Sequence, residues 1–99
     1  MVNEEMIQAR DFCNSYNVEM SFLYSLSDAG LLQITTIEEK IMIPEAQLPQ
    51  LEKWVRLRYE MDINIEGIEV IHHLLEQVKS MQEEMKFLKS RLGLYENAD

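Results

Sequence analysis

A heptad repeat in the last third of the chain limits its possible folds more than any other feature. Apolar residues recur there at alternating intervals of three and four, so that every a and d position is apolar. These positions are Ile71, Leu74, Val78, Met81, Met85, Leu88, Leu92 and Tyr95. No helix breaker is expected before Gly93, and at about 1.5 Å per residue the segment 65–95 predicts a helix on the order of 45 Å long.

Such a helix is longer than a chain of 99 residues can cover with its own core. The flanking sequence "KSMQEEMKFLKSR" is heavily charged, whereas the seam is continuous. We therefore expect a homodimer in which two copies of the seam pack together as a coiled coil. An ordinary helix packed along its own domain is the alternative. The sequence leaves open whether the two helices run parallel or antiparallel. Glu84 and Lys89 would suit a parallel pairing, but one ion pair is weak evidence for it.

Two short helices are predicted in the first thirty residues. Residues 4–15 place apolar side chains on one helical face, with Asn3 as the N-cap and "NSYN" as the break. The face comprises Met6, Ile7, Ala9, Phe12 and Cys13. A second helix over 19–29 buries Met20, Leu23, Leu26 and Ala29 and stops at Gly30. Two helices joined by about four turn-forming residues predict a helix-turn-helix.

A hairpin and a third helix follow. Residues 34–37 and 41–43 are β-branched or apolar runs around a polar "EEK" turn, which predicts a short β-hairpin wing. A single helical turn is expected near Glu45, and the main helix begins close to Pro49. Its inward side chains are expected to be Leu51, Trp54, Val55, Leu57 and Met61.

These elements predict a mainly α fold in one structural domain. Residues 1–63 form a winged helix-turn-helix module with a supporting helix, and residues 64–99 form the long dimerisation helix and a short tail.

Charge narrows the choice of partner. Acidic residues outnumber basic residues 18 to 9, which gives a net charge of −9. This field repels nucleic acid and anionic membranes and favours a protein that presents Lys and Arg, although excess acid can also serve solubility alone. No membrane span is expected, and neither the acidic "MVNEEMIQARDF" start nor the lone cysteine indicates export. A cytoplasmic location is the expectation.

Catalytic or metal chemistry is not expected. His72 and His73 are adjacent, about 100° apart on a helix, and cannot share a metal ion. Cys13 lies among apolar neighbours and is interpreted as a small core residue. The basic residues near Trp54 have two interpretations. They could bind nucleic acid, or their aliphatic stems could simply pack on the protein while their charged ends form local ion pairs, which is the more ordinary case. These residues are Lys53, Arg56 and Arg58. We therefore expect a protein that is not an enzyme and that uses no cofactor or metal.

The order of elements resembles the MerR class of regulators. In "VRLRYEMDINIEGIEVIHHLLEQVKSMQEEMKFLKSRL", residues 55–92, the likeness narrows to the CbpM-type chaperone-modulator family. In that family a "VRLRxEL" stretch precedes a "xGI" entry and a long "LxxENxxLxxRL"-like helix. The resemblance is specific in the last 40 residues and looser in the first 50. It implies a small dimer that binds the J domain of a DnaJ/CbpA-like co-chaperone and blocks both its work with the chaperone and its DNA binding. J domains engage their chaperone through a basic helix, which suits an acidic competitor.

Departures from the DNA-binding members of the MerR class point the same way. Their recognition helix carries two arginines, and the matching positions here are Ser21 and Tyr24. Residues 11–39 contain five acids and no base, so phosphate neutralisation is missing. The expected partner-binding residues are Glu19, Phe22, Tyr24, Asp28, Glu38 and Glu39. A MerR-family DNA-binding transcription regulator is the alternative function, and a structural dimer with another protein partner is a third.

Overall fold

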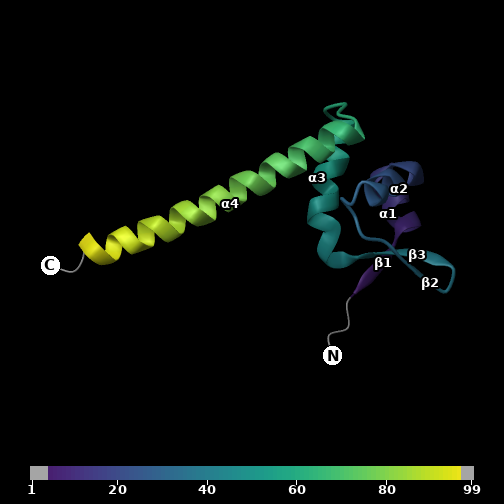
Figure 1. Cartoon of the computed structure of the whole chain (residues 1–99). Coiled ribbons are helices and arrows are strands. Elements are labelled where there is room, and N and C mark those ends of the chain that lie inside the picture. The colour runs from purple at the N-terminus through teal and green to yellow at the C-terminus, as the bar shows by residue number, and fades with distance from the viewer. Residues whose placement is uncertain (1–4, 97–99) are drawn as a thin grey trace. The chain divides into compact units, whose positions relative to one another are not determined.

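The computed structural model describes the backbone of residues 5–96 and the side chains of residues 5–93. The elements run in the order β1 (Met6–Gln8), α1 (Ala9–Tyr16), α2 (Met20–Asp28), β2 (Thr35–Ile37), β3 (Lys40–Pro44), η1 (Glu45–Gln47), α3 (Leu48–Tyr59) and α4 (Ile65–Glu96) (Figure 1). The mainly helical fold, the helix-turn-helix, the hairpin wing and the long last helix are thereby confirmed. Contacts divide the chain into two units, Met1–Glu69 and Val70–Asp99, with the boundary inside α4.

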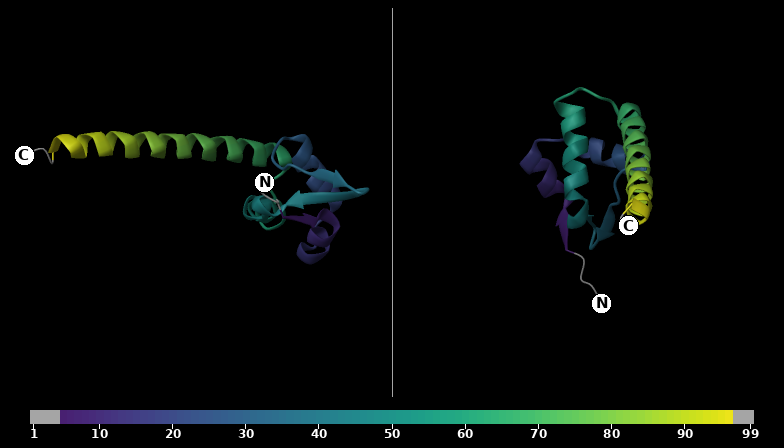
Figure 2. Two further views of the ribbon diagram at one scale, coloured as in Figure 1. Left: turned by 90° about the horizontal axis from the view of Figure 1, so that it is seen from below. Right: turned by 90° about the vertical axis from the view of Figure 1, so that its left-hand side faces the viewer.

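The first unit contains a three-stranded antiparallel sheet. Its order is β1-β3-β2, so β3 is central and pairs Ile7 with Ile43 on one side and Thr36 with Ile41 on the other (Figure 2). The predicted hairpin is therefore present, and its turn is shorter than expected. Only Glu38 and Glu39 lie between the strands, both with positive φ (51° and 66°). We call residues 35–44 the wing.

The strand β1 corrects the expected first helix. Residues 6–8 are extended and paired with β3, so the helix begins at Ala9 and its N-cap is Gln8. The expected N-cap Asn3, together with Glu4, lies outside the described residues. A pairing with strand residues more than thirty positions away overrides the local helical periodicity, which is a weak determinant over three residues. The helix ends as expected, with Asn17 in the left-handed region at φ 57°.

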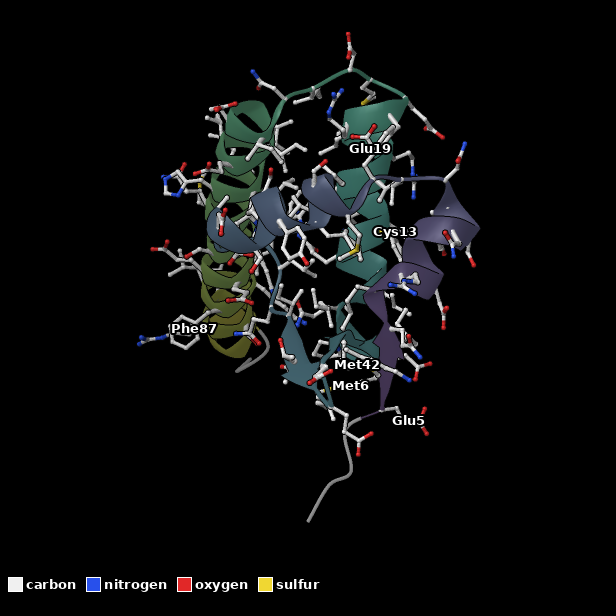
Figure 3. All side chains as sticks on the ribbon, turned by 90° about the vertical axis from the view of Figure 1, so that its right-hand side faces the viewer. Glu5, Met6, Cys13, Glu19, Met42 and Phe87 are labelled. Atoms are coloured by element: carbon white, nitrogen blue, oxygen red, sulfur yellow. The ribbon has the colours of Figure 1, made fainter. Side chains whose placement is uncertain are left out.

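A compact apolar core holds the first unit together. Its largest fully buried side chains come from α2, the central strand, α3 and the start of α4: Trp54, Leu23, Leu26, Ile43, Leu51 and Ile68. The indole N–H of Trp54 donates to the Leu31 carbonyl oxygen at 3.2 Å, so its one polar atom is satisfied inside. Cys13 is also buried, as interpreted from the sequence, and Figure 3 shows it pointing inward.

One residue expected in the core is exposed, and four others are only partly buried: Met20, Ala29, Val55 and Leu57. Met61 is 65% exposed because α3 ends at Tyr59 and the chain turns through Asp62, at φ 56°. The helical period that predicted an inward Met61 no longer applies beyond the helix end. Ala29, at the end of α2, is only half-buried.

The start of α4 is fixed by a local cap. The side-chain oxygen of Asn64 accepts a hydrogen bond from the Gly67 N–H at 2.9 Å, which is an N-cap. A Cβ atom at Gly67 would lie only 2.7 Å from Cγ2 of Ile63. From this start α4 runs as one helix of 32 residues, through Gly93, as the sequence predicted.

Candidate protein-interaction surfaces

The expected partner-binding residues centre on α2, whose start is held by α3. Glu19 is the N-cap residue, and its backbone N–H donates to the Tyr59 hydroxyl oxygen at 3.2 Å. The Glu19 carboxylate makes no capping bond to the helix backbone; it accepts a hydrogen bond from the Ser21 hydroxyl at 3.2 Å. Glu19 is exposed, and Figure 3 labels it at this end of the helix.

Phe22 corrects the expected surface. It is only 6% exposed and meets the Tyr59 ring edge-on, with ring centroids 5.5 Å apart and planes at 83°. Tyr24, by contrast, is 44% exposed. The spacing of Met20, Leu23 and Leu26 did not indicate that Phe22 also faces inward. It does so because the Tyr59 ring packs against it. Phe22 is therefore part of the core.

Tyr24 and Glu39 meet at a hollow between α2 and the wing. The hollow has a volume of about 350 Å³ and is lined by Gln8, Arg10, Met20, Tyr24, Glu39, Lys40 and Ile41. We call it the α2–wing hollow. It brings together Arg10 and Lys40, the two basic residues that bracket the base-free segment 11–39. Sequence reasoning missed this convergence, because the two residues are thirty positions apart.

Asp28 lies at a second and more acidic hollow. This hollow, about 640 Å³, is lined by Ser25, Asp28, Ala29, Arg58, Asp62, Asn64, Ile65, Glu66 and Glu69. Four carboxylates face one guanidinium there, and Arg58 is already paired with Asp62 at 3.3 Å. We call it the acidic hollow. Part of this cluster was predictable from the sequence, because Glu66 and Glu69 are three residues apart and therefore lie on one face of a helix.

The six expected residues do not form a single patch. Tyr24 and Glu39 share the α2–wing hollow, Asp28 belongs to the acidic hollow, and Glu19 is at the opposite end of α2 from Asp28. Glu38 is exposed at the tip of the wing. The acidic character expected for the α2 surface is strongest where α2 ends, near the first turns of α4.

The basic cluster on α3 does not form a nucleic-acid handle with Trp54. The indole is 1% exposed, so it offers no face for stacking. Arg58 pairs with Asp62 and lies 5.6 Å from the centroid of the Tyr59 ring. Packed stems and a local ion pair, the ordinary interpretation, describe Arg58 well.

Groups that could carry other chemistry are few in the described part of the chain. Burial raises the pKa of the Cys13 thiol, which disfavours the reactive thiolate. Among residues 5–96, no group of three or more His, Cys, Asp or Glu side chains is placed to hold a metal ion. Within the same residues, no helix combines the length and the apolar character needed to cross a bilayer.

The helix α4 exposes its heptad seam along the second unit. Leu74, Val78, Met81, Met85, Leu88 and Leu92 are each between 46% and 60% exposed. Ile71 is half-buried, and the Tyr95 side chain lies outside the described residues. Phe87 is also exposed, at 59%, and sits outside the seam at a c position beneath the guanidinium of Arg91. Figure 3 shows it extending outward from the helix.

Comparison with known proteins identifies the family to which this architecture belongs. The model of the family described as MerR HTH family regulatory protein matches residues 7–90. The chain is also similar to the chaperone modulatory protein CbpM of Pseudomonas entomophila (strain L48), with 26% identity over 91 residues. That alignment covers 90% of this chain and 89% of the relative. The expected resemblance to a CbpM-type protein within the MerR-like class is thus confirmed.

The family match spans both helices of the helix-turn-helix, the wing, α3 and most of α4. With its winged helix-turn-helix and long final helix, this chain belongs to the MerR helix-turn-helix family of regulatory proteins.

Proposed function

We propose that this protein is a chaperone modulator that binds the J domain of a DnaJ/CbpA-like co-chaperone. By occupying that domain it inhibits the co-chaperone's work with its chaperone and its DNA binding. The similarity to a protein named chaperone modulatory protein, over most of both chains, supports the proposal. The acidic hollow is the observation that carries it, because it offers a basic helix the complementary charge.

The acidic hollow is the principal docking surface in this proposal. Its carboxylates are all exposed, and one arginine balances only one of the four charges. A basic helix laid across it would meet Asp28 from α2 and Glu66 and Glu69 from α4. Tyr24, exposed on the same helix as Asp28, supplies an aromatic anchor, and Glu19, Glu38 and Glu39 extend the negative field that steers the encounter.

The position of Asp28 supports a role in binding. It is the last residue of α2, where the partial negative charge of the helix end disfavours an acid, and no basic residue in the last turn offsets it. Substitution by lysine should therefore stabilise the helix. Asp28 weakens its own helix and lines an acidic hollow. A role in binding a cationic group of a partner explains such an acid better than a role in stabilising the fold does.

Self-association is the second part of the proposal. The exposed seam on α4 pairs with the seam of another copy, which makes the active species a homodimer. Six of its leucine, valine and methionine side chains are about half exposed in the single chain, and such a continuous stripe marks an interaction surface. A dimer would present two docking surfaces to two J domains.

Calorimetric titration with the J-domain co-chaperone encoded in the same genome tests the function. We expect binding at low salt that weakens as salt rises. The variant Asp28→Lys/Glu69→Lys should bind about tenfold or more weakly, mainly through slower association. The control Glu60→Lys/Glu83→Lys carries the same charge change outside the acidic hollow and should bind nearly as tightly as wild type. Absence of wild-type binding at low salt would reject the function; equal losses in both variants would reject this surface.

A DNA-binding transcription regulator remains the second candidate, because the family match is to regulatory proteins. It predicts a gel shift with DNA near the protein's own promoter, with steep salt dependence. Ser21 and Tyr24, where DNA-binding members carry arginine, argue against it. A site-specific complex that survives physiological salt would favour this candidate over the first.

A further inference from the structure

The α2–wing hollow differs in charge from the rest of the molecule. The chain has nine basic residues against eighteen acids, and two of the five basic residues in the first unit line this one hollow. Arg10 comes from the first turn of α1 and Lys40 is the first residue of β3, so two separate elements direct cations to one place. Among the described residues of the lining, Glu39 is the only acid.

Neither cation is used to hold the fold together. Both are exposed, and among the described side chains the one salt bridge joins Arg58 and Asp62 rather than either of them. Arg10 is also poorly placed for its own helix, because a cation in the first turn opposes the helix dipole. Two cations that form no salt bridge with the described side chains converge in a strongly acidic protein, and one of them is unfavourable to its own helix, which favours an anionic ligand.

The size and lining of the hollow suit a single carboxylate. At about 350 Å³ it lies at the lower end of the roughly 300–1,000 Å³ typical of small-ligand sites, so it accepts one side chain rather than an extended segment. A guanidinium can bind both carboxylate oxygens, and an ammonium adds a second charge-assisted bond. The half-exposed Tyr24 offers a hydroxyl donor and an apolar ring face in the same lining.

A phosphate of nucleic acid fits this surface less well. Duplex DNA carries one charge per about 1.7 Å of its axis, so phosphates on either side of a bound one would face the carboxylates of the wing and of α1. Glu38 at the wing tip and Asp11 beside Arg10 are both exposed. An isolated carboxylate on a protein that is otherwise basic meets no such repulsion.

We propose that the α2–wing hollow binds one aspartate or glutamate side chain of the partner protein, held by Arg10 and Lys40 with Tyr24 against it. This rests on the proposed function, since the carboxylate belongs to the same J-domain protein whose basic surface meets the acidic hollow. The opposite charge sign of the two hollows fixes the orientation of the partner. A basic helix without a matching acid would be attracted but not aligned.

The test is titration of Arg10→Gln/Lys40→Gln against the J-domain protein. This variant is two units more acidic, so attraction between net charges alone would make it bind a basic partner more tightly. We expect instead binding about ten- to a hundredfold weaker, with faster dissociation. The control Lys53→Gln/Lys79→Gln makes the same charge change outside the hollow and should bind as tightly as wild type or slightly more tightly. Circular dichroism should show unchanged folding, because all four side chains are exposed.

A charge swap identifies the occupant. We expect Arg10→Glu/Lys40→Glu to regain affinity for a co-chaperone in which one specific J-domain acid is changed to lysine. If wild type binds and the Gln double variant binds equally or more tightly, the carboxylate site is wrong and the proposed function stands. If wild type does not bind, both are wrong. If the Gln double variant loses DNA binding that wild type shows in a gel shift, the occupant is a phosphate and the proposal is overturned.

Discussion

The two units use apolar residues in opposite ways. In Met1–Glu69 the large apolar side chains converge from α1, α2, β3 and α3 on one core, and Trp54 is 1% exposed. In Val70–Asp99 the same kinds of side chain occupy one helix, and Leu88 is 58% exposed. A hydrophobic fraction of 46% therefore reports two quantities at once, the apolar surface a chain buries by itself and the apolar surface left for a partner.

The largest expected effect contrasts truncation of a core side chain with truncation of a seam side chain. Trp54→Ala should lower the free energy of unfolding of the first unit by about 3–5 kcal/mol, because it removes a fully buried indole and its hydrogen bond to Leu31. This loss should not depend on protein concentration. Leu88→Ala should destabilise only where copies associate, so its effect should vanish on dilution. Chemical denaturation followed by circular dichroism at several concentrations measures both, and a concentration-independent loss for Leu88→Ala would break the comparison.

The next largest effect is expected from substitutions in the seam that prevent a second copy from packing against it. Val78→Asp and Met85→Asp each place a charge at an a position, where packing of a second copy would leave it uncompensated. We expect self-association to weaken by about a hundredfold or more in sedimentation equilibrium, consistent with the ~3–5 kcal/mol of an uncompensated buried charge. Ser80→Asp, which adds the same charge at an exposed c position, should remain dimeric. An intact dimer in both seam variants would show that the seam is not the interface.

A smaller effect is expected in the wing. Glu38 and Glu39 both have positive φ, in the kind of two-residue hairpin turn that favours Asn-Gly. Glu38→Asn/Glu39→Gly should raise the free energy of unfolding by about 1–2 kcal/mol, because left-handed backbone is unfavourable for glutamate. Thermal denaturation measures the gain. In stopped-flow binding to the J-domain protein, the same variant should associate more slowly, whereas an unchanged association rate would place the partner away from the wing.

The smallest effect is a pH dependence at the start of the sheet. A hydrogen bond from Glu45 to the Glu5 carboxylate, with repulsion between the two groups, raises the pKa of Glu45. A raised carboxyl pKa contributes stability that is fully present below the unfolded-state value and is lost as pH rises through the folded-state value. Denaturation of wild type and Glu45→Gln between pH 4 and 7 should therefore show the wild type gaining relative stability toward acid. Parallel stability curves would contradict this coupling.

Local patterns predicted the elements that depend on local sequence. The heptad repeat predicted the helical run of α4 from Ile71 onward, and Pro49 predicted where α3 begins, because both signals depend on neighbours within a turn or two. The strand β1 was not predictable in this way, since Met6–Gln8 is extended only through its pairing with Met42–Pro44. Glu38 and Glu39 were expected in the turn, whereas the left-handed backbone of both residues was not.

The candidate surfaces were predicted only in part for the same reason. The burial of Phe22 depends on where Tyr59 lies, because the two rings pack edge-on although Tyr59 is far along the chain. Sequence composition predicted an acidic interaction surface. It could not predict that Asp28 would join Glu66 and Glu69, or that Arg10 would join Lys40, because each grouping is made by the fold.

The close approach at Gly67 has a consequence for how this family can vary. Any side chain at position 67 would collide with the methyl group of Ile63 that lies 2.7 Å from the place of its Cβ. Relatives with alanine at 67 should therefore carry a smaller residue at 63, and the two positions should change together. Where position 63 keeps a β-branched side chain, glycine at 67 should be retained.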